Sequence, residues 1–194
     1  MNYDLILGIL NIVLISTTPL VFAGIGELVT EKSGVLNLGL EGLMLVGAVS
    51  GFISLVITGN YFYSFILSIL SGVVLSSIFA FFVLRLLTNQ IATGLALTIF
   101  GIGLSAMLGK KFAGTPINGL SPYYLIIFSF ILVFLINYIL YKTKAGLIIR
   151  AVGENHHSAY ALGYDVIKTR YLTIIFGGVM SSLAGFYISV CYAP

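Results

Sequence analysis

Polar side chains are rare in this sequence, and those that interrupt its apolar runs are the first candidates for chemistry. Asn37 and Glu41 stand among three glycines, Gly34, Gly39 and Gly42, in an otherwise apolar stretch. A carboxylate at the middle of a membrane costs about 3 kcal/mol even on the mildest scale, so it usually faces a cavity or a partner. Glu41 has a second interpretation, an ordinary charge at the level of the lipid headgroups, and the sequence leaves both open.

A second polar segment lies between Gly153 and Gly163. The residues between these glycines, 154–162, suffice for about two helical turns. Ala159 and Leu162 stand three positions apart in the segment and give the helix a weak apolar face. A short rigid helix of this kind is suited to contact with a partner protein, whereas the alternative is a solvated loop.

The motifs of catalysis and metal binding are missing. The nearest approach to a phosphate-binding loop, at Lys110, lacks both the first glycine and the Ser/Thr that holds magnesium. His156 and His157 are the only histidines, and adjacent helical residues point about 100° apart rather than toward one metal ion. Cys191 is the only cysteine, which excludes a disulfide. We therefore expect no catalytic residues, no metal site and no cofactor, and we expect any ATP hydrolysis to belong to another chain.

The composition indicates which elements must position these residues. Only 8% of the 194 residues are charged, against roughly 25% in an ordinary soluble domain, and 59% are hydrophobic. The charge-free runs cover residues 5–26, 42–84, 86–109, 112–141 and 171–194. About 20 mostly apolar residues span a bilayer as a helix, and the shorter, alternating segments of a β-barrel are not seen. The sequence predicts an all-α, polytopic transmembrane helical bundle.

The runs divide into six spans, because a Gly59-Asn60 turn splits the longest run. The predicted spans cover residues 5–25, 38–58, 61–84, 91–108, 123–141 and 171–190. Residues 27–37 are predicted to be too polar to lie in lipid, and Asp165 is predicted to cap a separate short helix over 166–170. Small residues four apart predict close packing between helices. They are the pairs Gly47/Gly51, Gly178/Ser182 and Ser181/Gly185.

The distribution of basic residues predicts an orientation. Six spans place three connections, residues 27–37, 85–90 and 142–170, on one side of the membrane. That side receives seven of the nine Lys and Arg residues, and the other side receives only Lys110 and Lys111. Because basic residues stay cytoplasmic, we expect residues 142–170 inside and the N-terminus outside. This topology explains the net charge of +3, so nucleic acid is not an expected partner.

Three stretches of the sequence resemble one family of membrane proteins. They are residues 18–44, with Ser-Gly-Val-Leu-Asn-Leu-Gly-Leu-Glu-Gly at 33–42, residues 89–98, and residues 146–163. Together they are similar to the permease subunits of ATP-binding-cassette importers that take up simple sugars and nucleosides. The resemblance covers almost the whole chain, and the sequence at 33–42 favours the nucleoside branch.

The resemblance implies a half-translocator in the inner (plasma) membrane of a bacterial cell, driven by ATPase subunits on partner chains. A second permease subunit, an extracellular substrate-binding lipoprotein and membrane lipid are the other implied partners. The substrate path would lie near Asn37, Glu41 and Asn89, and the neutral amides of the two asparagines suit the hydroxyls of an uncharged ribosyl ligand. A coupling helix would dock the ATPase. Its implied residues are Gly153, Glu154, Asn155, Ala159, Leu162 and Gly163.

Two departures from the family pattern bear on this interpretation. His156 stands where the family usually has proline, and the single transmembrane domain predicted for residues 1–194 lacks the family's later spans, so we expect it to be incomplete. An ion-coupled secondary transporter and a structural membrane subunit are the alternatives. A secondary transporter should carry paired broken helices in two related halves, and a structural subunit has no need of a glycine-bracketed helix in its basic connection.

Overall fold

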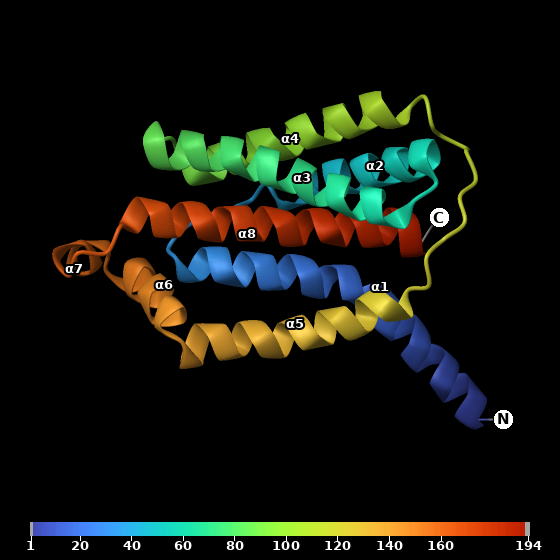
Figure 1. The fold of residues 1–194 in the computed structure, drawn as a ribbon, viewed down its shortest axis with the longest axis horizontal. Coiled ribbons are helices and arrows are strands. Elements are labelled where there is room, and N and C mark those ends of the chain that lie inside the picture. The colour runs from blue at the N-terminus through green and yellow to red at the C-terminus, as the bar shows by residue number, and fades with distance from the viewer. Residues whose placement is uncertain (1, 193–194) are drawn as a thin grey trace.

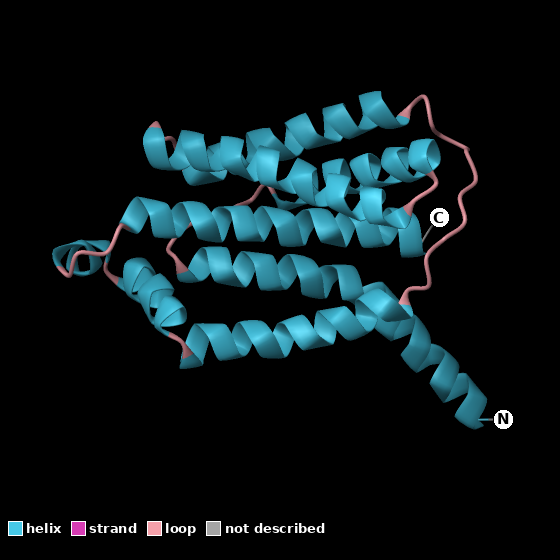
Figure 2. Cartoon of the chain, viewed as in Figure 1, coloured by secondary structure: helices cyan, strands magenta, loops and turns pink. Residues whose placement is uncertain are grey.

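A computed structural model describes residues 2–192, and this part of the chain is helical, with no strand (Figure 2). The α-helices are α1 (Asn2–Lys32), α2 (Leu40–Thr58), α3 (Tyr61–Ala80), α4 (Gln90–Gly109), α5 (Tyr123–Lys142), α6 (Lys144–Glu154), α7 (His156–Ala161) and α8 (Val166–Tyr187). Two π-helical turns, η1 (Phe81–Arg85) and η2 (Ile188–Tyr192), continue α3 and α8. The prediction of an all-α bundle is confirmed.

Within residues 2–192, six helices are long and apolar enough to cross a membrane, as the charge-free runs predict. They are α1, α2, α3 with η1, α4, α5, and α8 with η2. Polar residues set the first turns of two of them. The Oδ1 atoms of Asn60 and Asn89 accept from the backbone N–H groups of Phe62 and Ile91, each at 2.9 Å, and so cap α3 and α4.

Two predicted boundaries are wrong, both next to polar residues. Residues 27–32 continue α1 as helix rather than forming a polar connection, and Glu31 and Lys32 point to the exposed side of its last turn. Asp165 caps the last span itself, because its Oδ1 accepts from Lys168 N (2.9 Å) and α8 then runs unbroken from Val166. In both cases a charged residue lies at the end of a long helix, where it stays accessible, rather than marking a separate element.

The centre of the bundle is α8, which contacts α1, α2 and α3 (Figure 1). In the most apolar stretch of 18 residues along α8 and η2, 72% of the residues are buried, whereas 17% are buried in the corresponding stretch of α1. The small residues permit this packing, as predicted. A Cβ at Gly47 would lie 2.5 Å from Ser182 Cα, and Cβ atoms at Gly178 and Gly185 would overlap Ser76 and Met44. The helix α4 then packs on α2, and α5 on α1.

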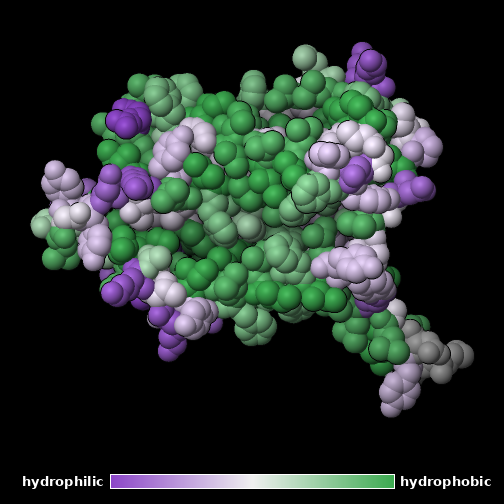
Figure 3. Space-filling model, in the orientation of Figure 1, coloured by the Kyte–Doolittle hydropathy of each residue, from purple (hydrophilic) through white to green (hydrophobic). Residues whose placement is uncertain are grey.

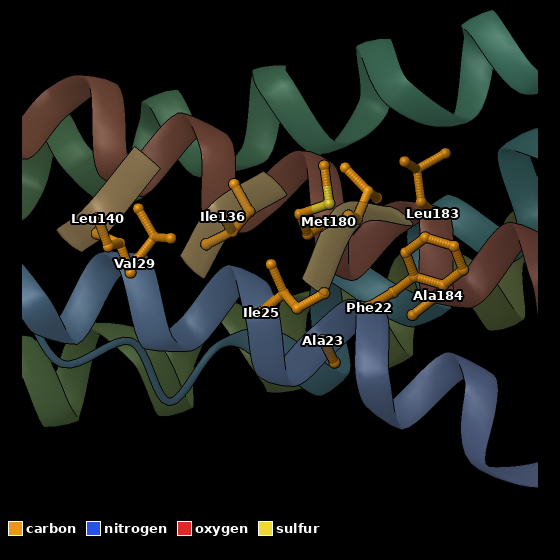
Figure 4. Close-up of a cluster of buried hydrophobic side chains, with 10 residues drawn as sticks. Phe22, Ala23, Ile25, Val29, Ile136, Leu140, Met180, Leu183 and Ala184 are labelled. Atoms are coloured by element: carbon orange, nitrogen blue, oxygen red, sulfur yellow. The ribbon is translucent and has the colours of Figure 1, made fainter. Parts of the chain in front are cut away.

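Large apolar side chains fill the space on the other side of α8, between α1 and α5 (Figure 4). The buried residues are Phe22, Ala23, Ile25 and Val29 of α1, Leu132, Ile136 and Leu140 of α5, and Met180, Leu183 and Ala184 of α8. A second cluster joins α2, α3, α4 and α8 and includes Val35, which lies between α1 and α2. The bundle therefore has a core on each side of its central helix.

The connections gather at two ends of the bundle (Figure 1). One end holds residues 86–89, residues 143–165 and the start of residues 33–39, which then run inward along α4, and the other end holds the start of α1, residues 59–60 and residues 110–122. Hydrophobic residues cover the middle of the face shown in Figure 3, and hydrophilic residues gather toward the two ends. This grouping matches the two predicted sides of a membrane, whereas the orientation toward the cell stays a prediction.

Candidate functional site

The chain leaves the helical conformation between α1 and α2, over residues 33–39, which we call the connecting segment. Its odd-numbered residues are buried and its even-numbered residues are exposed. Backbone N–H and C=O groups outside a helix need other hydrogen-bond partners, and within the hydrocarbon layer of a membrane such backbone occurs only where protein or a cavity surrounds it. Side chains from three helices supply the partners here.

Helix α4 bonds the second half of the connecting segment. The backbone N–H of Leu36 donates to Gln90 Oε1 (2.9 Å), and the Leu38 carbonyl accepts from Thr98 Oγ1 (3.0 Å). The two backbones approach closely at Gly94, where a Cβ would lie 2.8 Å from Leu38 N. The position of α4 therefore determines where this half of the segment can lie.

Helices α8 and α6 hold the first half of the connecting segment. Arg170 Nε donates to the Ser33 carbonyl (3.1 Å), and Thr173 Oγ1 donates to Ser33 Oγ (2.8 Å). Gly34 has a φ of +83° and packs against the end of α6. A Cβ at Gly34 would lie 3.2 Å from Arg170 Nη2 and 3.3 Å from Gly153 Cα. One charged side chain and one glycine contact thus join the segment to both helices.

Glu27 and Asn37 form the polar centre of the site. The backbone N–H of Asn37 donates to Glu27 Oε1 (3.2 Å), and Asn37 Oδ1 accepts from Gly39 N (2.9 Å). Within residues 2–192 no hydrogen-bond partner is found for two other buried atoms of this pair, Glu27 Oε2 and Asn37 Nδ2. Two residues joined by a backbone hydrogen bond therefore each bury a further polar atom without a protein partner, an acceptor on Glu27 and a donor on Asn37, although such groups are normally satisfied.

The predicted path residues lie at different positions around this centre. Asn37 is 1% exposed and belongs to the centre itself. Glu41 is exposed in the first turn of α2, two residues after the connecting segment ends. Asn89 is exposed and caps α4, next to Gln90, which bonds the segment. The structure thus places all three in or beside one region but buries only Asn37.

Sequence reasoning missed the helix residues that bond this segment, among them Glu27, Gln90 and Arg170. Glu27 fell in a stretch that was expected to be a polar connection. The other two contact the segment across 54 and 137 residues of sequence, so no local pattern marks them. They are identified only by the packing of α4 and α8 against the segment.

Helix α6 was also missed, although its sequence carries a signal. Ala145, Ile148, Ile149 and Val152 repeat at helical spacing, and the first three line an apolar cavity of about 340 Å³ between α1, α5, α6 and α8. Thr143 caps α6 through Oγ1, which accepts from Gly146 N (3.3 Å). The segment between the last two spans is therefore mostly helix.

The predicted helix over residues 154–162 is shorter than expected. Glu154 is the last residue of α6, and Asn155 caps α7 through Oδ1, which accepts from Ser158 N (3.1 Å). An asparagine at that position ends one helix and begins the next, because its side chain replaces the missing backbone partner. The predicted single helix is thus wrong at its start.

The apolar face predicted for this helix is also wrong. Ala159 is 1% exposed and points into the chain, whereas Leu162 is 74% exposed. The reason is the end of α7, where Gly163 has a φ of +85° and Tyr164 N donates to the Ala159 carbonyl (3.1 Å). This turn places Leu162 one residue beyond the helix, and Tyr160, on the helix itself, is also exposed (75%).

Comparison with known proteins agrees with this architecture. The family described as "Branched-chain amino acid transport system / permease component" matches residues 9–193. The chain belongs to this family. The permease is therefore a multi-pass membrane protein, as its six apolar helices indicate.

Three curated relatives of the permease are transport proteins. A putative glucose ABC transporter permease of Haloferax volcanii is 35% identical over 96% of the chain. A guanosine ABC transporter permease of Bacillus subtilis and a nucleoside ABC transporter permease of Lactococcus lactis are each 29% identical over 89% of it. The chain covers 64% of the length of each relative. No solved structure matches it.

Proposed function

We propose that this chain is the transmembrane permease subunit of an ATP-binding-cassette importer and forms half of the translocation path for a nucleoside or a simple sugar. The observation that carries the proposal is its likeness to glucose, guanosine and nucleoside permeases along nearly all of its length. ATPase subunits, a second permease subunit and an extracellular substrate-binding lipoprotein complete the importer. The chain acts in the inner (plasma) membrane of a bacterial cell.

The Glu27–Asn37 centre is the proposed polar part of the substrate path. Its unpartnered Nδ2 donor and Oε2 acceptor complement a hydroxyl group, which accepts one hydrogen bond and donates another. A sugar or ribose carries several such groups, and displacement of the connecting segment would bring them to these atoms. Glu41 and Asn89 flank the segment and are proposed to line the same path.

Uptake of radiolabelled guanosine and glucose by the assembled importer tests this path. Glu27→Gln keeps an oxygen that accepts from Asn37 N, but it replaces the unpartnered Oε2 acceptor with an amide donor. The substrate then loses one hydrogen bond to a charged group, so we expect uptake to fall by about tenfold. Glu41→Ala should reduce uptake less, because its side chain is exposed. Normal uptake by both variants, with normal assembly, would contradict the assignment.

The segment from Gly153 to Gly163 is the proposed coupling site for the ATPase. Its large exposed apolar side chains are Tyr160 and Leu162, so these replace Ala159 as the residues proposed to enter a groove on the partner. Glu154 and Asn155 lie at the junction of α6 and α7. Motion of α6 would reach the substrate path directly, because Gly153 packs against Gly34 of the connecting segment.

Capture of the ATPase on the purified permease tests this contact. Leu162→Glu should release the ATPase and abolish uptake while the permease keeps its level in the membrane, because an unpaired charge is costly in an apolar contact. Ser158→Glu introduces the same charge at another exposed position of α7 and should retain the ATPase. Retention of the ATPase by both variants would contradict the coupling role and leave α7 as a solvated surface helix.

Cysteine labelling tests the proposed orientation. The single natural thiol, Cys191, is buried and is removed by Cys191→Ser. Asn60→Cys should then react with an impermeant reagent from outside the cell, and Ser158→Cys only after the membrane is opened. The opposite pattern would place the seven basic residues outside and overturn the orientation.

A further inference from the structure

A groove lies where η1 ends and α8 begins, at the end of the bundle that holds α6 and α7. It is lined by Phe81 and Arg85 of η1, by Asp165, and by Ile167, Lys168, Tyr171 and Leu172 of α8. Its volume is about 730 Å³, within the range of roughly 300–1,000 Å³ that is usual for small-ligand sites. The proposed transport function uses none of these residues.

Two cations define the outer part of the groove. Arg85 is the last residue of its membrane-spanning helix, and Lys168 is the third residue of the last one. Both therefore lie at the level where apolar helices meet the headgroups. Asp165 is the one carboxylate of the lining, and its Oδ1 already accepts from Lys168 N (2.9 Å) as the cap of α8.

Apolar side chains form the inner part of the groove. Phe81 precedes Arg85 by four residues along η1 and Leu172 follows Lys168 by four along α8, so each lies about one helical turn deeper than the cation. Both are exposed, Phe81 by 50% and Leu172 by 59%. On both walls a positive charge at the boundary is thus followed by an apolar surface one turn deeper.

We propose that this groove binds an anionic phospholipid, with the phosphate between Arg85 and Lys168 and an acyl chain against Phe81 and Leu172. Guanidinium and ammonium groups donate strong charge-assisted hydrogen bonds to phosphate oxygens. Basic pockets between membrane helices are known to take lipid headgroups of this charge. A free phosphate would leave the apolar wall uncovered, and an apolar partner would leave two cations unpaired.

A fluorescent reporter in the groove tests the proposal. The chain has no tryptophan, so Phe81→Trp introduces its single indole. The full chain is reconstituted into phosphatidylcholine vesicles that contain a minor fraction of phosphatidylglycerol. Bromine, which quenches the indole fluorescence, is attached to the phosphatidylglycerol in one sample and to an equal amount of the phosphatidylcholine in the other. We expect the quenching to give a preference of about tenfold for phosphatidylglycerol, since two basic residues contribute. Equal quenching per brominated lipid would overturn the proposal.

Three further variants separate the groove from general attraction to a basic surface. Adding Arg85→Gln and Lys168→Gln should abolish the preference, whereas Lys110→Gln with Lys111→Gln, which removes the same charge at the other end, should retain it. Tyr141→Trp places the reporter at the end of α5 beside Lys142, outside the groove, and should show no comparable preference. The same preference at both reporters would also overturn the proposal, even if the double variant fails to fold.

Discussion

The connecting segment (residues 33–39) and the α7 region (residues 155–165) lie at the same end of the bundle, and each contains one glycine with a positive φ. Side chains of α1, α4 and α8 bond the backbone of the connecting segment. In the α7 region the caps and turn bonds join residues that are close in sequence. The conformation of the connecting segment therefore depends on the relative positions of three helices. The conformation of the α7 region depends mainly on its own residues.

The two glycines offer the largest test of this comparison. Gly34 and Gly163 have φ values of +83° and +85°, so an alanine at either position is strained by about 1–2 kcal/mol. A Cβ at Gly34 also meets Arg170 and Gly153, whereas a Cβ at Gly163 meets nothing within 4 Å. We expect Gly34→Ala to lower the free energy of unfolding by about 3 kcal/mol because overpacking is added to strain, and Gly163→Ala by about half as much. Steric-trapping unfolding in bicelles measures both, and equal losses would contradict the difference in packing.

Arg170 gives the second test, because it links the first half of the connecting segment to α8. Arg170→Gln shortens the side chain and removes the charged donor from the Ser33 carbonyl, so we expect a loss of about 2 kcal/mol in the free energy of unfolding. Lys144→Gln removes a charge at the exposed start of α6 and should change it by less than about 0.5 kcal/mol. Similar values for the two variants would show that the Arg170 bond does not hold the segment.

Asn155 gives the smallest and most local test. Asn155→Ala removes the cap of α7, and we expect the helix to lose about 1 kcal/mol of local stability while the bundle keeps its own. Amide hydrogen exchange should accelerate in residues 156–161 alone, and Asn155→Asp should restore the slow exchange because it also accepts from Ser158 N. Faster exchange in the connecting segment as well would show that the two regions are not independent.

Local patterns in the sequence account for most of the fold. Each of the six spans follows from an apolar run, because the bilayer requires about 20 apolar residues and an internally bonded backbone. Asn60 and the Gly59 turn mark a helix boundary by their own chemistry. Helix α6 was within reach too, since Ala145, Ile148, Ile149 and Val152 have helical spacing.

The candidate site was predictable only in part. Asn37 was singled out because an amide among apolar residues and glycines needs a partner; the structure buries it beside Glu27, while its place in a substrate path stays a prediction. Ala159 was assigned to the wrong surface, because its burial depends on how α7 folds back at Gly163 rather than on its spacing from Leu162.

The sequence by itself determined the number and nature of the spans, the two groups of connections and the family, because each depends on residues near one another in the chain. Only the tertiary structure decided that Glu27, Gln90 and Arg170 hold the connecting segment. The bonds of Gln90 and Arg170 form only when α4 and α8 are packed in place, and the bond of Glu27 forms because α1 continues to Lys32 and the chain then returns alongside it. The side-chain partners of a non-helical segment are therefore a property of the assembled bundle, whereas the apolar runs that build the bundle are a property of the chain.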